Sequence, residues 1–170
     1  MTLFLEDLHS QITNQQRTIL TTIWTYYCEH NEWIDIRLLH QREGGKSVVR
    51  PALEKLGGSI IFEQEYATNT HYQLTFLGAL LTKKGEQHEQ LLTEYLGYLV
   101  RLTQQEPLRD YVCGQEIAAE LKLTSEQNIV LGRLIYLGDI FSRSMGAYGT
   151  SEWDAGIPTD IEDLPTDLLT

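Results

Sequence analysis

The residues that could support phosphate binding or catalysis do not form a complete motif in this chain. Gly44-Gly45-Lys46-Ser47 is similar to the end of a phosphate-binding loop, but that motif needs a glycine at position 40, which is His40. The residues before the run have a helical pattern, whereas a phosphate-binding loop follows a strand. We therefore interpret residues 44–47 as a turn between two helices.

The histidines and cysteines do not suggest a metal site. The five histidines are scattered, and no His or Cys pair has the spacing of a zinc site. Cys28 and His30 are two residues apart on a predicted helix, so their side chains point in different directions. Cys113 is the second cysteine, and two are too few for a disulfide framework and typical of a reducing compartment. We predict no metal and no cofactor.

Glu63 and Glu65 are paired carboxylates on one face of a predicted strand. In a hairpin exposed to water, such a pair increases solubility and does not form an acid–base couple. The sequence contains no arrangement that would activate a nucleophile. We predict that the chain is not an enzyme and has no small-molecule substrate.

The chain is acidic, with a net charge of −11, but its charge is uneven. Residues 152–170 carry six acidic residues and no Lys or Arg, whereas residues 36–56 carry five basic and two acidic residues. An acidic protein repels a polyanion at long range, although a basic segment can still hold one locally. The first residues do not resemble a signal peptide, and no run approaches the roughly 20 apolar residues of a membrane helix. We expect a soluble, cytoplasmic protein.

One helical pattern occurs twice, 81 positions apart and without a gap. Shifting the sequence by this offset places apolar residues on apolar residues, as in the pairs Ile36/Ile117, Val49/Val130, Leu53/Leu134 and Leu56/Leu137. Each copy predicts a short helix, a turn, a second helix, a glycine stop and an extended apolar run. The sequence therefore predicts two related units.

The periodicity and the turn residues give boundaries for these units. Capping boxes at Thr13–Gln16 and Thr124–Gln127 each open a helix, and Gly57-Gly58 ends one. The predicted organisation is an N-terminal arm (1–12), a first unit (13–85), a connecting helix (86–106), a second unit (107–151) and an acidic tail (152–170). Residues 140–144 and the region around Tyr148 are the predicted strands of the second unit.

This order of elements resembles the winged helix-turn-helix superfamily, in tandem. The resemblance covers residues 13–82 well and 112–148 more loosely, and the run YQLTFLGALL resembles the end of such a unit. It implies a mainly α fold with small β-wings, in which a long helix joins two winged-helix-like units. In this superfamily the third helix usually enters the DNA major groove and the wing contacts phosphate. Winged helices also dock on proteins, and acidic tandem pairs occur as partners of chromosome-organising machinery.

The third helix of the first unit supplies the candidate nucleic-acid-binding residues, which are Arg42, Lys46, Ser47, Arg50 and Lys55. Its apolar residues at i, i+3, i+4 and i+7 from Val49 must face the core. The outward face is then centred on Ser47, Pro51 and Glu54, a poor set for reading bases. The predicted wing has no Lys or Arg between Lys55 and Lys83. These features weaken the DNA interpretation.

The third helix of the second unit is apolar on both sides. Transfer of the same face places Asn128, Gly132 and Ile135 outward, beside Leu131 and Tyr136. A helix that is apolar all round is covered on both sides, either by its own chain or by a partner. The candidate protein-interface residues are Leu131, Ile135, Tyr136, Trp153, Ile161 and Leu164.

Two hypotheses of different classes follow. The first is a non-enzymatic adaptor or regulatory subunit that docks on another protein. That protein can be a second copy of the chain, which would give a homodimer. The alternative is a DNA-binding transcriptional regulator that uses the third helix of the first unit and dimerises through the second. In either case the acidic tail is expected to lie part of the time over the basic segment 36–56, because tethering raises its effective concentration there.

Overall fold

The computed structural model describes residues 2–138, 145–146 and 152–157. The described chain is mostly helical, with small antiparallel sheets. It divides into an N-terminal unit, Leu5–Glu86, and a C-terminal unit that contains the residues from Gln87 onward. Among the described residues, no helix is both long and apolar enough to cross a membrane.

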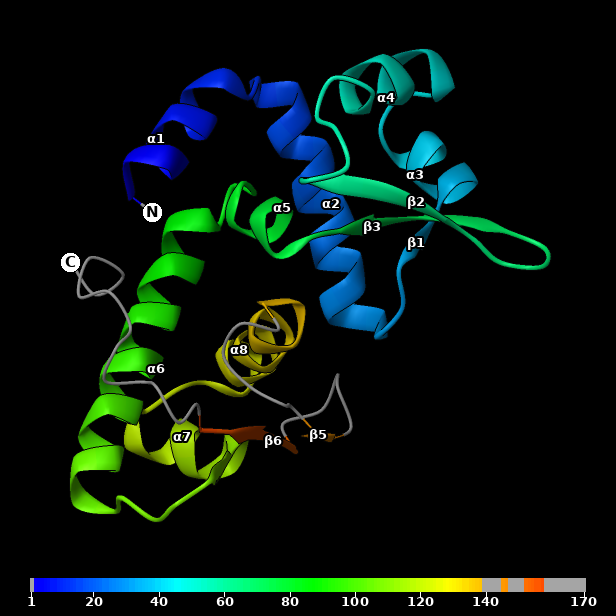
Figure 1. Cartoon of the computed structure of the whole chain (residues 1–170). Coiled ribbons are helices and arrows are strands. Elements are labelled where there is room, and N and C mark those ends of the chain that lie inside the picture. The colour runs from blue at the N-terminus through cyan, green and yellow to red at the C-terminus, as the bar shows by residue number, and fades with distance from the viewer. Residues whose placement is uncertain (1, 139–144, 147–151, 158–170) are drawn as a thin grey trace. The chain divides into compact units, whose positions relative to one another are not determined.

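The N-terminal unit places two short helices against a three-stranded sheet (Figure 1). After α1 (Thr2–Gln11), its elements are α2 (Asn14–His30), β1 (Ile34–Asp35), α3 (Ile36–Arg42), α4 (Lys46–Leu53), β2 (Ile61–Glu65), β3 (Thr70–Leu74) and α5 (Phe76–Leu80). The strand order is β1-β3-β2, and both pairings are antiparallel. The strand that precedes the two helices therefore pairs with the second strand of the hairpin that follows them.

The local signals of this unit are where the sequence predicts them. The capping box is present, since Thr13 Oγ1 accepts a hydrogen bond from the Gln16 amide and the Gln16 side chain accepts one from the Thr13 amide. Gly44 and Gly45 have φ values of 87° and 100°, which form the predicted turn before α4. α4 ends at Leu53, three residues before Leu56, the predicted end that precedes the Gly57-Gly58 stop.

The core of the N-terminal unit is formed by one face of α2 and the inner faces of the other elements. Arg17 on α2 also fixes the end of α1, because its guanidinium donates to the carbonyls of His9 (2.9 Å) and Leu81 (3.3 Å). Fully buried apolar side chains come from α2, β1, α3, α4 and β3, and they include Ile19, Leu20, Ile23, Ile34, Leu39, Val49 and Leu74. The predicted inward face of α4 is thus confirmed.

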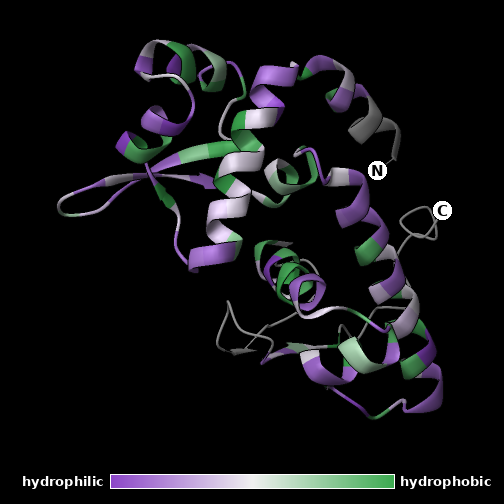
Figure 2. Ribbon diagram, turned by 180° about the vertical axis from the view of Figure 1, so that it is seen from behind, coloured by the Kyte–Doolittle hydropathy of each residue, from purple (hydrophilic) through white to green (hydrophobic). Residues whose placement is uncertain are grey.

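The C-terminal unit repeats the same order of one helix, one strand, two helices and two strands. Its elements are α6 (Gly85–Gln105), β4 (Tyr111–Cys113), α7 (Gly114–Glu120), α8 (Ser125–Gly138), β5 (Met145–Gly146) and β6 (Trp153–Gly156). The strand order β4-β6-β5 matches the order β1-β3-β2 of the N-terminal unit. Hydrophobic and hydrophilic segments alternate along α6 (Figure 2), as expected for a helix with one buried face. From Gln87 onward, α6 belongs to this unit, where it occupies the position in chain order that α2 has in the first.

The prediction that residues 152–170 form a tail is wrong for Trp153–Gly156. These residues form the central strand β6, in which Ala155 pairs with Val112 and is fully buried. The acids and glycine of this segment gave it the composition of a tail, but the strand gains its stability from pairing with β4 and β5 on both sides. The segments predicted as strands, 140–144 and the region around Tyr148, lie outside the described residues.

Trp153 holds β6 against the helices of its own unit. Its Nε1–H donates to the carbonyl oxygen of Asn128 (3.1 Å) and lies near that residue's Oδ1 (3.2 Å). A Cβ atom at Gly132 would lie 2.7 Å from Trp153 Cδ1, and one at Gly114 would lie 2.5 Å from the indole ring. The two glycines therefore leave the space that the indole fills.

A charged network joins α6 to the start of α7. Arg109 donates to Glu116, to Glu106 (3.4 Å) and to the Tyr111 carbonyl (2.9 Å), and Tyr98 Oη donates to Glu116 (2.8 Å). The hydrogen bond from Arg109 lowers the pKa of Glu116. Burial, followed by the bond to Glu116, raises the pKa of Tyr98 to about 12.

We expect Gly132→Ala to lower the free energy of unfolding by about 1–3 kcal/mol, because the new methyl group overpacks the Trp153 site. Gly97→Ala in α6 is the matched control, since its Cβ would meet Arg101 Nη1 at an ordinary 3.7 Å. That change should raise stability by about 0.5–1 kcal/mol, through helix propensity. Urea denaturation measures both, and a stabilising effect of Gly132→Ala would contradict the packing described for Trp153.

The Glu116 network predicts a dependence of stability on pH. A carboxyl group whose pKa is lowered on folding stabilises the protein above its unfolded pKa of about 4.3, and this contribution is lost as the pH falls. We therefore expect Glu116→Gln to destabilise the protein at neutral pH and to differ less from the wild type near pH 3. Glu120→Gln, on the same helix and exposed, is the control. A deficit that is the same at both pH values would contradict this account.

Candidate interaction face of the N-terminal unit

The sequence-predicted basic residues lie on the helical side of the N-terminal unit, and all of them are exposed. Arg42 ends α3, Lys46 and Ser47 open α4, Arg50 lies one turn further, and Lys55 follows the helix. The centre of the predicted outward face of α4, which is Ser47, Pro51 and Glu54, is also exposed. The structure thus brings the candidate nucleic-acid residues together on α3, α4 and the turn after it.

Two of these arginines already have partners within the unit. The Arg50 Nε atom lies 2.9 Å from Glu54 Oε1, in an i,i+4 pair of which both side chains are more than half exposed. The Arg42 guanidinium carbon lies 5.3 Å from the centre of the Tyr26 ring, within the range of a cation–π contact. A phosphate would have to compete with Glu54 for Arg50, which lowers the value of that residue for DNA binding.

The β2–β3 hairpin, which is the predicted wing, is acidic where it borders this helical side. Glu63 and Glu65 of β2 are exposed, and Glu63 pairs in register with Tyr72 of β3. The Tyr72 side chain is buried. Burial, followed by the negative charge of the nearby Glu63, raises the pKa of Tyr72 to about 12. Glu63 is therefore an exposed carboxylate that lies close to the Tyr72 side chain.

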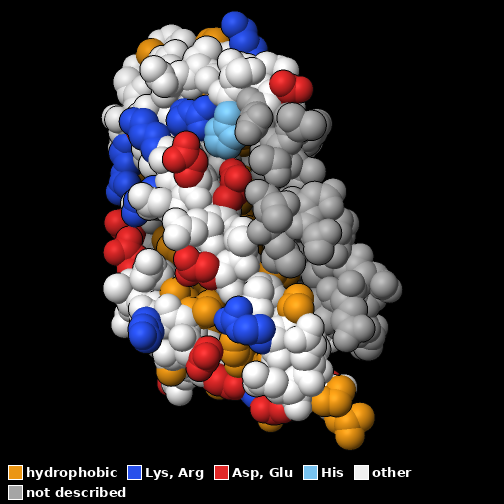
Figure 3. Space-filling model, turned by 90° about the vertical axis from the view of Figure 1, so that its left-hand side faces the viewer, with side chains coloured by type: hydrophobic (Ala, Val, Ile, Leu, Met, Phe, Trp, Pro, Cys, Tyr) orange, Lys and Arg blue, Asp and Glu red, His pale blue; other side chains and the backbone are white. Residues whose placement is uncertain are grey.

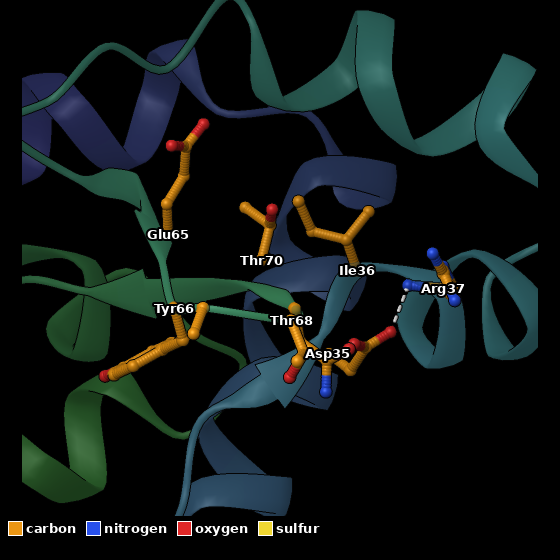
Figure 4. A pocket seen from close by; sticks show the side chains of 9 residues that line it. Asp35, Ile36, Arg37, Glu65, Tyr66, Thr68 and Thr70 are labelled. Carbon is orange, nitrogen blue, oxygen red and sulfur yellow. Dashed lines mark hydrogen bonds between the residues drawn. The ribbon is translucent and has the colours of Figure 1, made fainter.

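Two cavities lie between the hairpin and the helical side, one near each end of β2. The first, of about 200 Å³, is bounded by α4, the Gly57-Gly58 turn and the start of β2, and it is lined by Arg50, Leu53, Glu54, Ile61, Phe62, Glu63 and Tyr72. The second, of about 310 Å³, lies between the start of α3 and the loop 65–70. Glu65 and Thr70 project to the same side of this second cavity (Figure 4), as their pairing in register requires. We call the two cavities together with β2 the wing groove.

The charge of the wing groove is mixed but has an acidic excess along β2. Asp35 caps α3 by accepting a hydrogen bond from the Arg37 amide (2.7 Å), and Arg50 is paired with Glu54. β2 and β3 contain no Lys or Arg beside Glu63 and Glu65, and the Arg50 that lines the same cavity as Glu63 is the one paired with Glu54. Figure 3 draws a different side of the molecule, on which basic side chains gather in the upper part and acidic ones lie beside and below them. The arrangement does not resemble a continuous phosphate-binding surface.

The candidate interface residues of the C-terminal unit differ in their exposure to solvent. Leu131, Ile135 and Trp153 are buried, whereas Tyr136 is 47% exposed. The face of α8 predicted to point outward at Asn128 and Gly132 is covered by Trp153, a residue of the same unit. Of the four described candidates, a partner reaches only Tyr136. Ile161 and Leu164 lie outside the described residues.

Other chemistry has little support in the described part of the chain. Within residues 2–138, 145–146 and 152–157, no group of three or more His, Cys, Asp or Glu side chains could hold a metal ion. Cys28 and Cys113 are both half-buried thiols that form no disulfide. Sequence reasoning missed Tyr72, whose role depends on a partner nine residues away across the hairpin; the alternation of polar and apolar residues in β3 was the available signal.

Comparison of the chain with protein-family models, with curated proteins and with solved structures gave no match.

We expect Tyr72 and Glu63 to be coupled in a double-mutant cycle. Tyr72→Phe and Glu63→Gln should show a coupling of about 0.2–1 kcal/mol in the free energy of unfolding, because the two side chains lie directly opposite each other on one face of the hairpin. Glu65→Gln is the matched control, since it neutralises the next carboxylate on the same face of β2. Equal coupling of Tyr72→Phe to both glutamates would mean that the effect is general electrostatics and not the cross-strand contact with Glu63.

Proposed function

We propose that this chain is a non-enzymatic adaptor or regulatory subunit, built from two winged-helix-like units, that acts by docking on another protein. The repeated order of elements and the shared strand order support the assignment of two such units. In this interpretation α3 and α4 are the helix-turn-helix of the first unit and β2–β3 is its wing. α7, α8 and the strands β5 and β6 correspond to them in the second.

The observation that carries this proposal is the acidic wing beside a helix whose arginine is already paired. A wing that contacts phosphate needs cations, yet Glu63 and Glu65 are the charged side chains that β2 exposes. Arg50, at the middle of the third helix, is paired with Glu54. The net charge of −11 adds long-range repulsion of nucleic acid. These charges suit a protein partner better than DNA.

DNA binding remains the second candidate, because Arg42, Lys46, Arg50 and Lys55 are all exposed on the helical side. Dimerisation through α8, which the DNA hypothesis used, has less support, since Leu131 and Ile135 are buried. Exposed apolar side chains of the C-terminal unit that could meet a partner are instead Leu108, Tyr111 and Tyr136. Docking on a protein is also compatible with either unit.

A DNA titration separates the two functions. At roughly physiological salt we expect a dissociation constant weaker than about 10⁻⁶ M, a loss of binding at higher salt and no dependence on sequence. Fluorescence anisotropy with labelled duplexes is the measurement. Glu63→Lys/Glu65→Lys should strengthen the residual binding, because it removes repulsion from the wing. Glu29→Lys/Glu86→Lys is the control, since it changes the net charge by the same amount at exposed sites on α2 and α6, and it should have a smaller effect.

Tight and specific DNA binding would contradict the adaptor proposal. Sequence-dependent binding at about 10⁻⁸ M or tighter, abolished by Arg50→Ala, would replace the adaptor proposal by the DNA-binding one. Equal effects of the two double lysine variants would show that net charge, and not the wing, controls the residual affinity.

A further inference from the structure

The outer edge of β2 is an unpaired sheet edge that faces solvent. In the order β1-β3-β2, β2 pairs with β3 on one side and with no other described strand on the other. Phe62, Glu63, Gln64 and Glu65 are all exposed. An exposed edge offers a row of backbone donors and acceptors to another extended chain.

The hydrogen bonds at the two ends of the hairpin show which residues of β2 have backbone groups on that edge. The Tyr66 amide donates to the Asn69 carbonyl (2.8 Å), and the Thr75 amide donates to the Ile60 carbonyl (3.0 Å). In an antiparallel ladder, every second residue bonds to the partner strand, so Ile60, Phe62, Gln64 and Tyr66 face β3. The N–H and C=O groups of Ile61, Glu63 and Glu65 therefore point away from β3. The Ile61 amide donates to the Gly57 carbonyl (3.2 Å), and the Glu65 carbonyl accepts a hydrogen bond from Gln64 Nε2 (3.3 Å). A partner strand can therefore pair with the Ile61 carbonyl, both groups of Glu63 and the Glu65 amide.

The side chains of Ile61, Glu63 and Glu65 also line the wing groove. Ile61, Glu63 and Glu65 share one face of the strand, the face on which Tyr72 and Leu74 are buried. Glu63 lies directly opposite the buried Tyr72 in the register of the hairpin. Next to Ile61, the cavity of about 200 Å³ is lined by the apolar side chains of Leu53 and Phe62 and by the paired Arg50 and Glu54. Backbone groups, two carboxylates and a partly apolar cavity thus follow one another along one edge.

We infer that β2 binds an extended basic segment of a partner protein, which adds to the sheet as a fourth strand. This inference rests on the proposed protein-docking function and names its partner chemistry. Cations at alternate positions of the added strand lie beside Glu63 and Glu65, and an apolar side chain two residues further on lies beside Ile61 and enters the smaller cavity.

The charge of β2 favours this occupant over the two that the chain itself could supply, which are a second copy of β2 and the residues after Gly156. A second copy that pairs antiparallel through β2 would place Glu63 opposite Glu63 or Glu65, and like charges directly opposite destabilise a strand pair. The residues after Gly156 carry four acids and no Lys or Arg, so they have the wrong sign for this edge. The occupant is therefore a basic segment of another protein.

The test uses the full chain and two capped probe peptides, Leu-Thr-Lys-Thr-Lys and its reverse Lys-Thr-Lys-Thr-Leu, since the strand can add in either direction. We expect at least one to bind and to shift the amide resonances of Ile61, Glu63 and Glu65 in NMR titrations. Glu63→Gln/Glu65→Gln should weaken binding roughly threefold to thirtyfold. A peptide N-methylated at alternate residues on its pairing edge should not bind, because it lacks the donors that strand addition needs.

Matched controls define the results that overturn the inference. Glu29→Gln/Glu86→Gln removes the same charge at exposed positions of α2 and α6 and should leave binding unchanged. Equal weakening by this variant, binding of an analogue with Glu in place of Lys, shifts mapped away from β2, or no binding at millimolar peptide would each overturn it. So would a dimer of the free protein formed through β2, seen by sedimentation. The DNA titration is independent of these results, so the docking function can stand when this site fails.

Discussion

Each unit is closed by a strand pairing between residues far apart in the sequence, and the rest of the unit depends on it. β1 reaches its partner β3 across both short helices, and β4 reaches β6 in the same way. This pairing holds the two helices against the sheet and fixes the direction in which the hairpin leaves them. In the N-terminal unit it also decides the face of β2 that borders α3 and α4. The positions of Glu63 and Glu65 in the wing groove are consequences of that register.

The two units stabilise the same pairing with different chemistry. In the N-terminal unit, Ile34, Tyr72 and Leu74 bury the sheet against α2, and Glu63 lies opposite the tyrosine on the edge strand. In the C-terminal unit, β6 is anchored by one indole ring between Gly114 and Gly132. A single large side chain in a matched space tolerates little change. The hairpin edge of the first unit depends on no such fit, and so its exposed residues are available for binding.

Much of the fold could be predicted from the sequence, because its signals are local. The capping boxes, the Gly44-Gly45 turn and the apolar face around Val49 act within a few residues, and the structure has each of them. β6 could not be predicted from its own composition. WDAG forms a strand because Ala155 pairs with Val112 of β4 and because the Trp153 ring fills the space that Gly132 leaves. The sequence left open whether the outward side of α8 is covered by its own chain or by a partner. The structure shows Ile135 buried within the chain, and Trp153, more than twenty positions away, covers Asn128 and Gly132.

The candidate site shows the same division between local and long-range information. The exposure of Arg42, Lys46, Arg50 and Lys55 follows from helical periodicity, and the acidity of the wing can be read directly from its residues. Periodicity does not show that Arg50 is paired with Glu54, nor that the hairpin register places Glu63 opposite Tyr72 and beside Glu65 on one face. The first contact makes the arginine less available to a phosphate, and the register places two carboxylates in a row along the strand. Acidic side chains along an open strand edge favour a partner that brings both a backbone and the opposite charge.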